Sequence, residues 1–170
     1  MIAESYSSIL AYQLVLGARV NIDKVIFVAG FLRCPTALAR LAPWIRLAWI
    51  DYIPKRLLTW VLFDCYGSDA LLALFYQALH TIQDGCYDNA LKQRAKNIAT
   101  LRFECPSTPS HIPCLYLQAS RDVFVKKDQL ALFERAFCQV SSQQVQGSHF
   151  LLQTNPQAAW RAIMAFITKQ

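Results

Sequence analysis

The chain has 170 residues, of which 55% are hydrophobic and 16% are charged. This apolar content is enough for a folded core and excludes an intrinsically disordered chain. The net charge is +6, but the lysines and arginines are scattered and form no basic tract interleaved with aromatic residues. We therefore expect no nucleic-acid partner.

The six cysteines are widely spaced, with no C-x-x-C pair and no paired histidines at ligand spacing. Free thiols in apolar surroundings are therefore favoured over a disulfide or zinc framework. Glu4 and polar residues precede the first apolar run, unlike a signal peptide, so we expect a cytoplasmic protein. No uninterrupted apolar run reaches the ~18 residues of a membrane span, because charged residues and Pro54 interrupt residues 41–63.

The first residues, MIAESYSS, place a serine between small residues. Ser5 lies two residues after Ala3 and two before Ser7, and an apolar run that predicts a helix over residues 7–16 follows. This is a relaxed form of the G-x-S-x-G turn, which exposes a nucleophilic serine between a strand and a helix. The alternative is that Ser5 only caps its helix, as serine commonly does.

Residues 24–30 read KVIFVAG and predict a buried parallel strand. A long insertion follows, in which prolines, glycines and apolar periodicity predict helices over residues 36–41, 43–52, 54–63, 68–82 and 87–101. Its aromatic residues have two interpretations, since they could pack in a helical core or line an apolar acyl or alcohol pocket. The pocket candidates are Trp44, Trp49, Trp60 and Phe31.

The sheet resumes with a predicted strand over residues 112–119, a helix over 126–137 and a second strand over 140–146. Asp122 follows the first of these strands and His149 follows the second. Because the carboxyl ends of parallel strands share one edge of a sheet, we expect Asp122 and His149 to lie close together. The last helix should begin after an Asn155 N-cap, run to residue 167 and pack four side chains on the sheet. These are Trp160, Ile163, Met164 and Ile167.

A serine hydroxyl is a weak nucleophile unless an adjacent base takes its proton. His149 is the candidate base, and Asp122 the candidate acceptor that fixes the tautomer of the imidazole. Asp122 could instead cap the turn before the next helix. Asp128 is a competing acid but falls within that helix, where we expect it to be solvated.

Three segments resemble the α/β-hydrolase family: AESYS the serine turn, IPCLYLQASRD the strand and acid, and QGSHFLLQTNP the histidine loop. The resemblance implies the C-terminal portion of an α/β-hydrolase fold, an α/β parallel sheet flanked by helices. Residues 1–30 and 106–170 would form the core and residues 31–105 a helical lid. Only Ile2 and Ala3 remain of the strand before Ser5, so we expect an N-terminally truncated member, with the strand from Lys24 left as an unpaired sheet edge.

The resemblance also implies an esterase-like serine hydrolase that acts on small-molecule carboxylic esters or related acyl bonds, with an apolar group on the substrate. Ser5, His149 and Asp122 would be the catalytic triad, and the backbone N–H of Tyr6 one oxyanion donor. No metal or other cofactor is implied. Two alternatives stay open: a catalytically silent fragment, and a non-hydrolytic member in which these residues are only landmarks of the fold.

Overall fold

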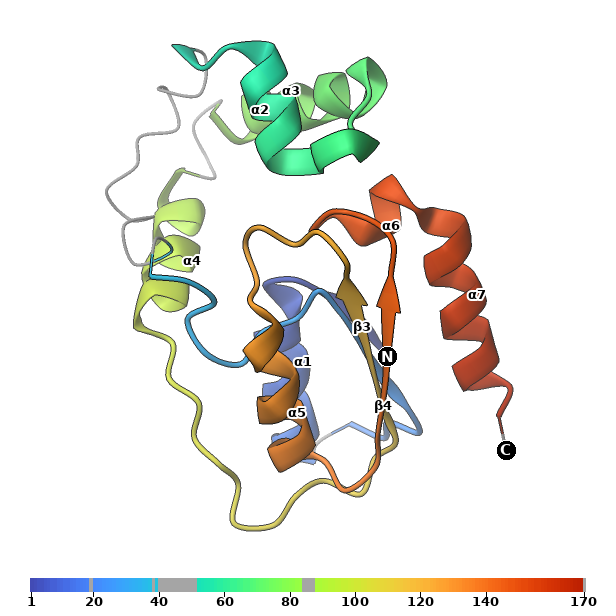
Figure 1. The fold of residues 1–170 in the computed structure, drawn as a ribbon. Coiled ribbons are helices and arrows are strands. Elements are labelled where there is room, and N and C mark those ends of the chain that lie inside the picture. Colours follow the sequence, from blue (N-terminus) through green and yellow to red (C-terminus); the bar gives the residue numbers. More distant parts are fainter. Residues whose placement is uncertain (19, 38, 40–51, 84–87, 170) are drawn as a thin grey trace.

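The computed structural model describes residues 1–18, 20–37, 39, 52–83 and 88–169. Strands and helices alternate through most of this region, and three α-helices and a short 3-10 helix are described between the second and third strands. Figure 1 shows their arrangement. In chain order the elements are β1 (Ile2–Glu4), α1 (Ser7–Gly17), β2 (Val25–Val28), α2 (Lys55–Phe63), η3 (Asp64–Tyr66), α3 (Asp69–Gln83), α4 (Asp88–Thr100), β3 (Cys114–Ala119), η4 (Lys127–Gln129), α5 (Leu130–Ala136), β4 (Val140–Val145), α6 (Leu151–Thr154) and α7 (Pro156–Ile167).

The four strands form one parallel sheet in the order β1-β2-β3-β4. The expectation that the strand from Lys24 is an unpaired edge is wrong, because β1 covers its outer side with Ile2 opposite Ile26. Backbone hydrogen bonds from Ile26 to Met1 and from Ser5 to Val28, each 2.9 Å, extend the pairing beyond the three residues of β1. A very short strand is therefore sufficient to place β2 inside the sheet, and β1 becomes the edge.

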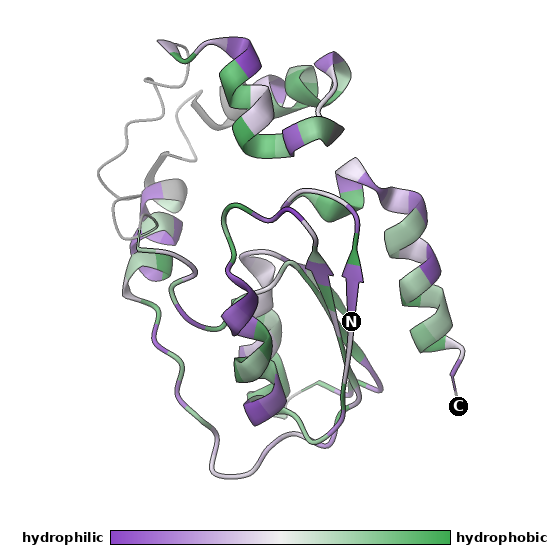
Figure 2. Cartoon of the chain, in the orientation of Figure 1, coloured by the Kyte–Doolittle hydropathy of each residue, from purple (hydrophilic) through white to green (hydrophobic). Residues whose placement is uncertain are grey.

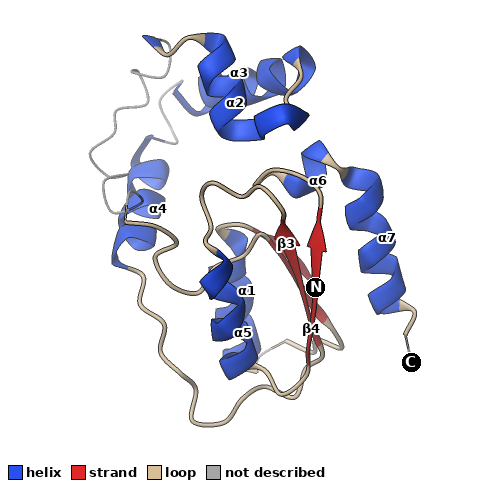
Figure 3. Ribbon diagram, viewed as in Figure 1, coloured by secondary structure: helices blue, strands red, loops and turns tan. Residues whose placement is uncertain are grey.

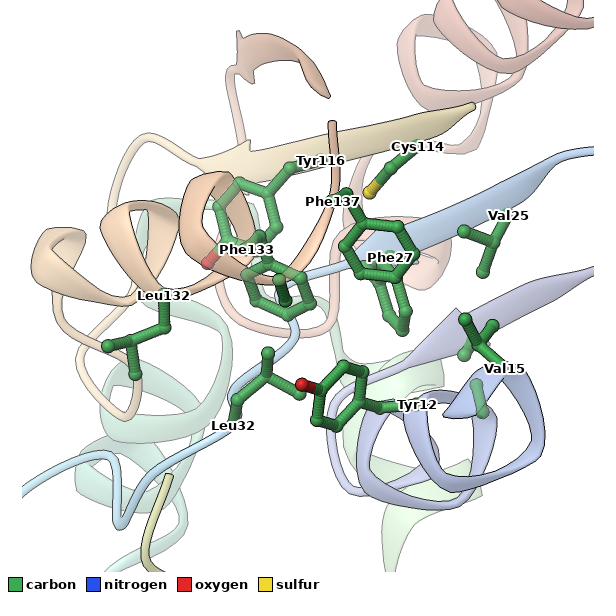
Figure 4. Packing of buried hydrophobic residues seen from close by; sticks show 13 residues of the cluster. Tyr12, Val15, Val25, Phe27, Leu32, Cys114, Tyr116, Leu132, Phe133 and Phe137 are labelled. Atoms are coloured by element: carbon green, nitrogen blue, oxygen red, sulfur yellow. The ribbon is translucent and has the colours of Figure 1, made fainter. Parts of the chain in front are cut away.

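Side chains of the central strands alternate between two cores, as the pleat of a strand requires. On one face, Val25 and Phe27 of β2 and Tyr116 of β3 point toward α1 and α5. They pack there against Phe133 of α5 (Figure 4). The ring centroid of Phe133 lies 4.7 Å from those of Phe27 and Tyr116. The alternate residues of the same strands pack against α6 and α7 on the other face. The sheet is thus covered by helices on both faces (Figure 3).

The last helix begins as the sequence predicts, with the Asn155 side chain accepting a hydrogen bond from the N–H of Ala158. Its predicted packing face is wrong in part, because Trp160 is 57% exposed and only Ile163 of the four expected contacts is buried. Met164 and Ile167 are 37% and 44% exposed. Ala159 and Ala162 occupy the buried stripe instead, since small side chains allow the helix backbone to approach the sheet closely.

The helices expected over residues 54–63, 68–82 and 87–101 are confirmed as α2, α3 and α4, with ends within one or two residues. The helix expected over 43–52 lies outside the described residues apart from its last position, and the one over 36–41 is described only at residues 36, 37 and 39. Helices α2 and α3 lie beyond the carboxyl ends of the strands (Figure 1), and hydrophobic residues run along both (Figure 2). None of the described helices is long and apolar enough to cross a membrane.

Candidate active site

Ser5 occupies a sharp turn between β1 and α1. Its φ is +53°, in the left-handed region that non-glycine residues rarely adopt, while its N–H still bonds to Val28 at the end of β2. Such local strain persists only where the surrounding structure holds it in place. Here the hydroxyl of Ser7 donates to the carbonyl of Glu4 at 2.7 Å, which closes the turn from the helix side.

Ser8 is the second support of this turn. Its Oγ lies 2.6 Å from the carbonyl oxygen of Ser5 and 2.9 Å from that of Phe31, and it accepts the N–H of Phe31 at 3.0 Å. A Cβ at Gly30 would lie 3.0 Å from the Cβ of Ser8, so the loop after β2 needs glycine to come this close. The hydroxyls of Ser7 and Ser8 are therefore engaged with the backbone, whereas that of Ser5 is directed to another side chain.

That side chain is His149. The Oγ of Ser5 lies 2.7 Å from Nε2 of His149, although 144 positions separate the two residues in the sequence. His149 follows β4 on a tight loop that begins at Gly147, whose φ is +155°. An L side chain would be strained at this φ, and its Cβ would lie 2.6 Å from Cδ1 of Leu151, so glycine is favoured where this loop turns against α6. His149 is buried, with 7% of its side chain exposed.

Asp122 completes the line of hydrogen bonds. The Nδ1–H of His149 donates to Oδ2 of Asp122 at 2.9 Å, and Oδ1 lies 3.1 Å from the same nitrogen. Oδ1 also accepts the backbone N–H groups of Phe124 and Val125 at 2.9 and 2.8 Å. The Asp122 carboxylate therefore caps its own turn and, at the same time, accepts a hydrogen bond from the imidazole. Asp128, the competing acid, is 53% exposed in an ion pair with Arg33.

The rings of Phe124 and Phe150 flank the imidazole edge-on, with centroids 5.2 and 5.3 Å from that of His149. The same two rings pack against the apolar side chains of α2 and α3, and the centroid of Phe63 lies 5.6 Å from that of Phe150. Helices α2 and α3 therefore rest on the residues that surround His149. An ion pair of 3.0 Å between Asp64 and Arg121 joins the same helical segment to the loop of Asp122.

Tyr6 follows the nucleophile candidate directly. In the described part of the chain, no acceptor pairs with its backbone N–H, which stays available next to Ser5. Its ring lies under Arg94, 5.6 Å from the guanidinium carbon, and its hydroxyl accepts a hydrogen bond from Asn97 at 3.1 Å. Both contacts come from α4, so this helix fixes the side chain of Tyr6.

The predicted aromatic pocket is not assembled by the described residues. Phe31 is 2% exposed and packs with Ile9 and Val125, whereas Trp60 is 62% exposed on α2. Trp44 and Trp49 lie outside the described residues. A cavity of about 480 Å³ lies instead beside Tyr6, between α1 and α4.

Comparison with known proteins identifies the architecture. No protein-family model and no curated protein matches the chain. Many solved structures do match, among them a thermophilic esterase with a TM-score of 0.75 at 11% identity, over 98% of this chain and 64% of that one. The epoxide hydrolase CorEH has a TM-score of 0.74 at 12% identity, over 97% and 66% of the two chains. A hydrolase from Pseudomonas aeruginosa PA01 has a TM-score of 0.72 at 13% identity, over 99% and 64%.

The chain has the α/β-hydrolase fold. Its parallel sheet and flanking helices correspond to about two thirds of these structures, since the chain spans 64% to 66% of their length. The names of the similar structures cover different activities, so the fold leaves the reaction open and the site must be argued from its own residues.

Within this α/β-hydrolase fold, sequence reasoning found the three residues that the structure brings together but missed their supports. The hydrogen bonds of Ser8, the flanking rings of Phe124 and Phe150, and the contacts of Glu4 described below depend on which loops meet in space. Of these supporting residues, only Glu4 could have been suspected from the sequence, because it adjoins Ser5. Among the described residues, no cluster of acidic, histidine and cysteine side chains could hold a metal ion, and the described cysteines are free thiols.

Proposed function

We propose that the chain carries the site of a serine hydrolase that acts on carboxylic esters or related acyl bonds. The observation that carries the proposal is one continuous line of hydrogen bonds, 2.7 Å from Ser5 to His149 and 2.9 Å from His149 to Asp122. A hydroxyl, an imidazole and a carboxylate in this order form the arrangement that activates serine in hydrolases on several unrelated folds.

In the first half of the reaction, Nε2 of His149 takes the Oγ proton of Ser5 as Oγ attacks the carbonyl carbon of the substrate. Asp122 accepts the Nδ1–H throughout, which keeps the lone pair of Nε2 facing Ser5 and stabilises the imidazolium that forms. The backbone N–H of Tyr6 is one donor to the oxyanion, because it follows the nucleophile at the start of α1. Collapse of the tetrahedral intermediate breaks the ester bond, and His149 gives its proton to the departing alcohol oxygen.

In the second half, water loses a proton to Nε2 of His149 and attacks the acyl-serine. The second intermediate then releases the carboxylic acid, and the proton returns from His149 to Oγ of Ser5. The proposed substrate is a small molecule with an apolar group, because the rings of Phe124 and Phe150 lie beside the imidazole and apolar side chains of α2 and α3 pack on them.

The test is covalent labelling of the purified chain by a fluorophosphonate probe, which phosphonylates activated serines. We expect labelling of wild type and of Ser142→Ala, and none of Ser5→Ala. Ser142 is the matched control, since it is an exposed serine on β4 that takes no part in the Ser5 turn. Failure of the folded wild-type chain to react, or equal labelling of Ser5→Ala, would overturn the proposal.

A further inference from the structure

A fourth side chain links the two ends of the site. Glu4 is the last residue of β1 and adjoins Ser5, and its carboxylate crosses to the chain just after His149. There Oε1 accepts the backbone N–H of Leu152 at 3.2 Å, and Oε2 accepts the side-chain N–H of Gln153 at 3.1 Å. These contacts join residues 148 and 149 positions apart in the sequence.

The contact with Leu152 meets a need of helix α6. The first N–H groups of any helix lack partners within it, and a side chain at the N-cap normally supplies one. The N-cap residue of α6 is Phe150, which has no side-chain acceptor and makes no capping hydrogen bond. The carboxylate of Glu4 supplies the missing acceptor from another strand, and negative charge is favourable at that end of a helix.

The same residue is also fixed on the side of the nucleophile. The carbonyl of Glu4 accepts the hydroxyl of Ser7, and its backbone pairs with Val28 in the sheet. One residue is therefore bonded through its main chain to the Ser5 turn and through its side chain to the first turn of α6. His149 lies between these two anchors, one residue before the N-cap of α6.

We propose that Glu4 is a positioning residue, whose carboxylate holds the His149 loop at hydrogen-bond distance from Ser5. The inference rests on the proposed serine hydrolase function. Glu4 takes no proton in the reaction and acts only through the placement of His149. A small displacement of a catalytic group lowers rates steeply, by as much as about 100-fold for about 1 Å.

Three substitutions separate the effect of side-chain length at residue 4 from the effect of its charge. Glu4→Gln keeps the length and an acceptor oxygen but removes the charge, Glu4→Asp keeps the charge but is one methylene shorter, and Glu4→Ala removes both. We expect fluorophosphonate labelling to slow by about 10- to 100-fold in the Ala and Asp variants and to stay near the wild-type rate in the Gln variant. Gln153→Ala is the control for the outer contact and should change the rate little. Circular dichroism checks that each variant is folded.

A slow Gln variant with a normal Asp variant would show that charge rather than reach matters, and would overturn the proposal. Labelling of folded Glu4→Ala at the wild-type rate would also overturn it.

If wild type itself is not labelled, the function proposal fails, and nitrogen NMR of the His149 imidazole still tests whether Glu4 positions His149. Wild type and Glu4→Gln should then show one fixed tautomer, and Glu4→Asp an averaged one. Identical His149 spectra in wild type and Glu4→Asp would count against a positioning role.

Discussion

Replacement of Asp122 by asparagine tests the electrostatic logic of the site. Oδ1 of Asp122 accepts two backbone N–H groups, those of Phe124 and Val125, and Oδ2 accepts Nδ1–H of His149. In the variant the single amide oxygen must remain with the two backbone donors. The NH₂ group then faces His149, so its Nδ1 becomes the acceptor and its Nε2 carries the proton. A protonated Nε2 cannot take the proton of Ser5.

The reaction rate of the variant depends on how often the amide flips. A flipped amide restores the correct tautomer but leaves two partly buried N–H groups without an acceptor, at about 1–3 kcal/mol each. The sum, about 2–6 kcal/mol, corresponds to a rate lower by about 30-fold to about 10⁴-fold, since each 1.36 kcal/mol is a factor of ten. The upper end agrees with the loss of about 10⁴ that the same substitution causes in a serine protease triad.

The assay is the rate of Ser5 labelling by a fluorophosphonate probe, with nitrogen NMR of His149 to identify its tautomer. The matched control is Asp128→Asn, the same change at the exposed ion pair with Arg33, which should label at the wild-type rate. If Asp122→Asn labels within threefold of wild type, or if His149 keeps its proton on Nδ1 in that variant, the reasoning is refuted.

Further predictions concern stability and thiol chemistry. Ser8→Ala leaves the buried N–H of Phe31 without its acceptor and should lower the free energy of unfolding by about 1–3 kcal/mol in urea titrations, whereas Ser7→Ala should cost less; equal losses would contradict the role given to Ser8. Burial raises the pKa of the Cys114 thiol to about 12, so at pH 8 iodoacetamide should modify exposed Cys65 in the native chain and Cys114 only after unfolding, as mass spectrometry of peptides would show. Lys24 donates to the carbonyls of Phe166 and Ile167 at the end of α7 and to that of Lys169 just beyond it, and Lys24→Met should lower the free energy of unfolding by about 1 kcal/mol; an unchanged urea midpoint would show that these contacts contribute nothing.

Much of the fold could be predicted because its signals are local. The β-branched run of β2 and the apolar run of α1 are determined by the composition of short segments, and the Asn155-Pro156 start of α7 by its capping chemistry. The order of Ser5, Asp122 and His149 along the chain also suggested a single site, since parallel strands bring their carboxyl ends to one edge. These are consequences of the backbone and of residue type, and they need no knowledge of distant contacts.

The parts that sequence reasoning missed depend on how closely elements approach in space. Three residues before Ser5 were enough to pair with β2, because the hydrogen bonds of Met1 and Ser5 extend the strand pairing beyond them. Helix α7 turned its alanines rather than Trp160 to the sheet, since close approach favours small side chains over large ones.

The residues that support the site, such as Glu4 and Ser8, were also missed because their contacts depend on how closely distant elements approach in space. The carboxylate of Glu4 accepts the N–H of Leu152, which lies almost 150 positions later in the chain. Hydrophobic periodicity carries no information about such a long-range contact. The residue types and their order along the chain were therefore determined by the sequence alone. The distances of 2.7 and 2.9 Å that align Ser5, His149 and Asp122 were decided only by tertiary packing, because hydrogen bonds depend on tenths of an ångström that no local propensity specifies.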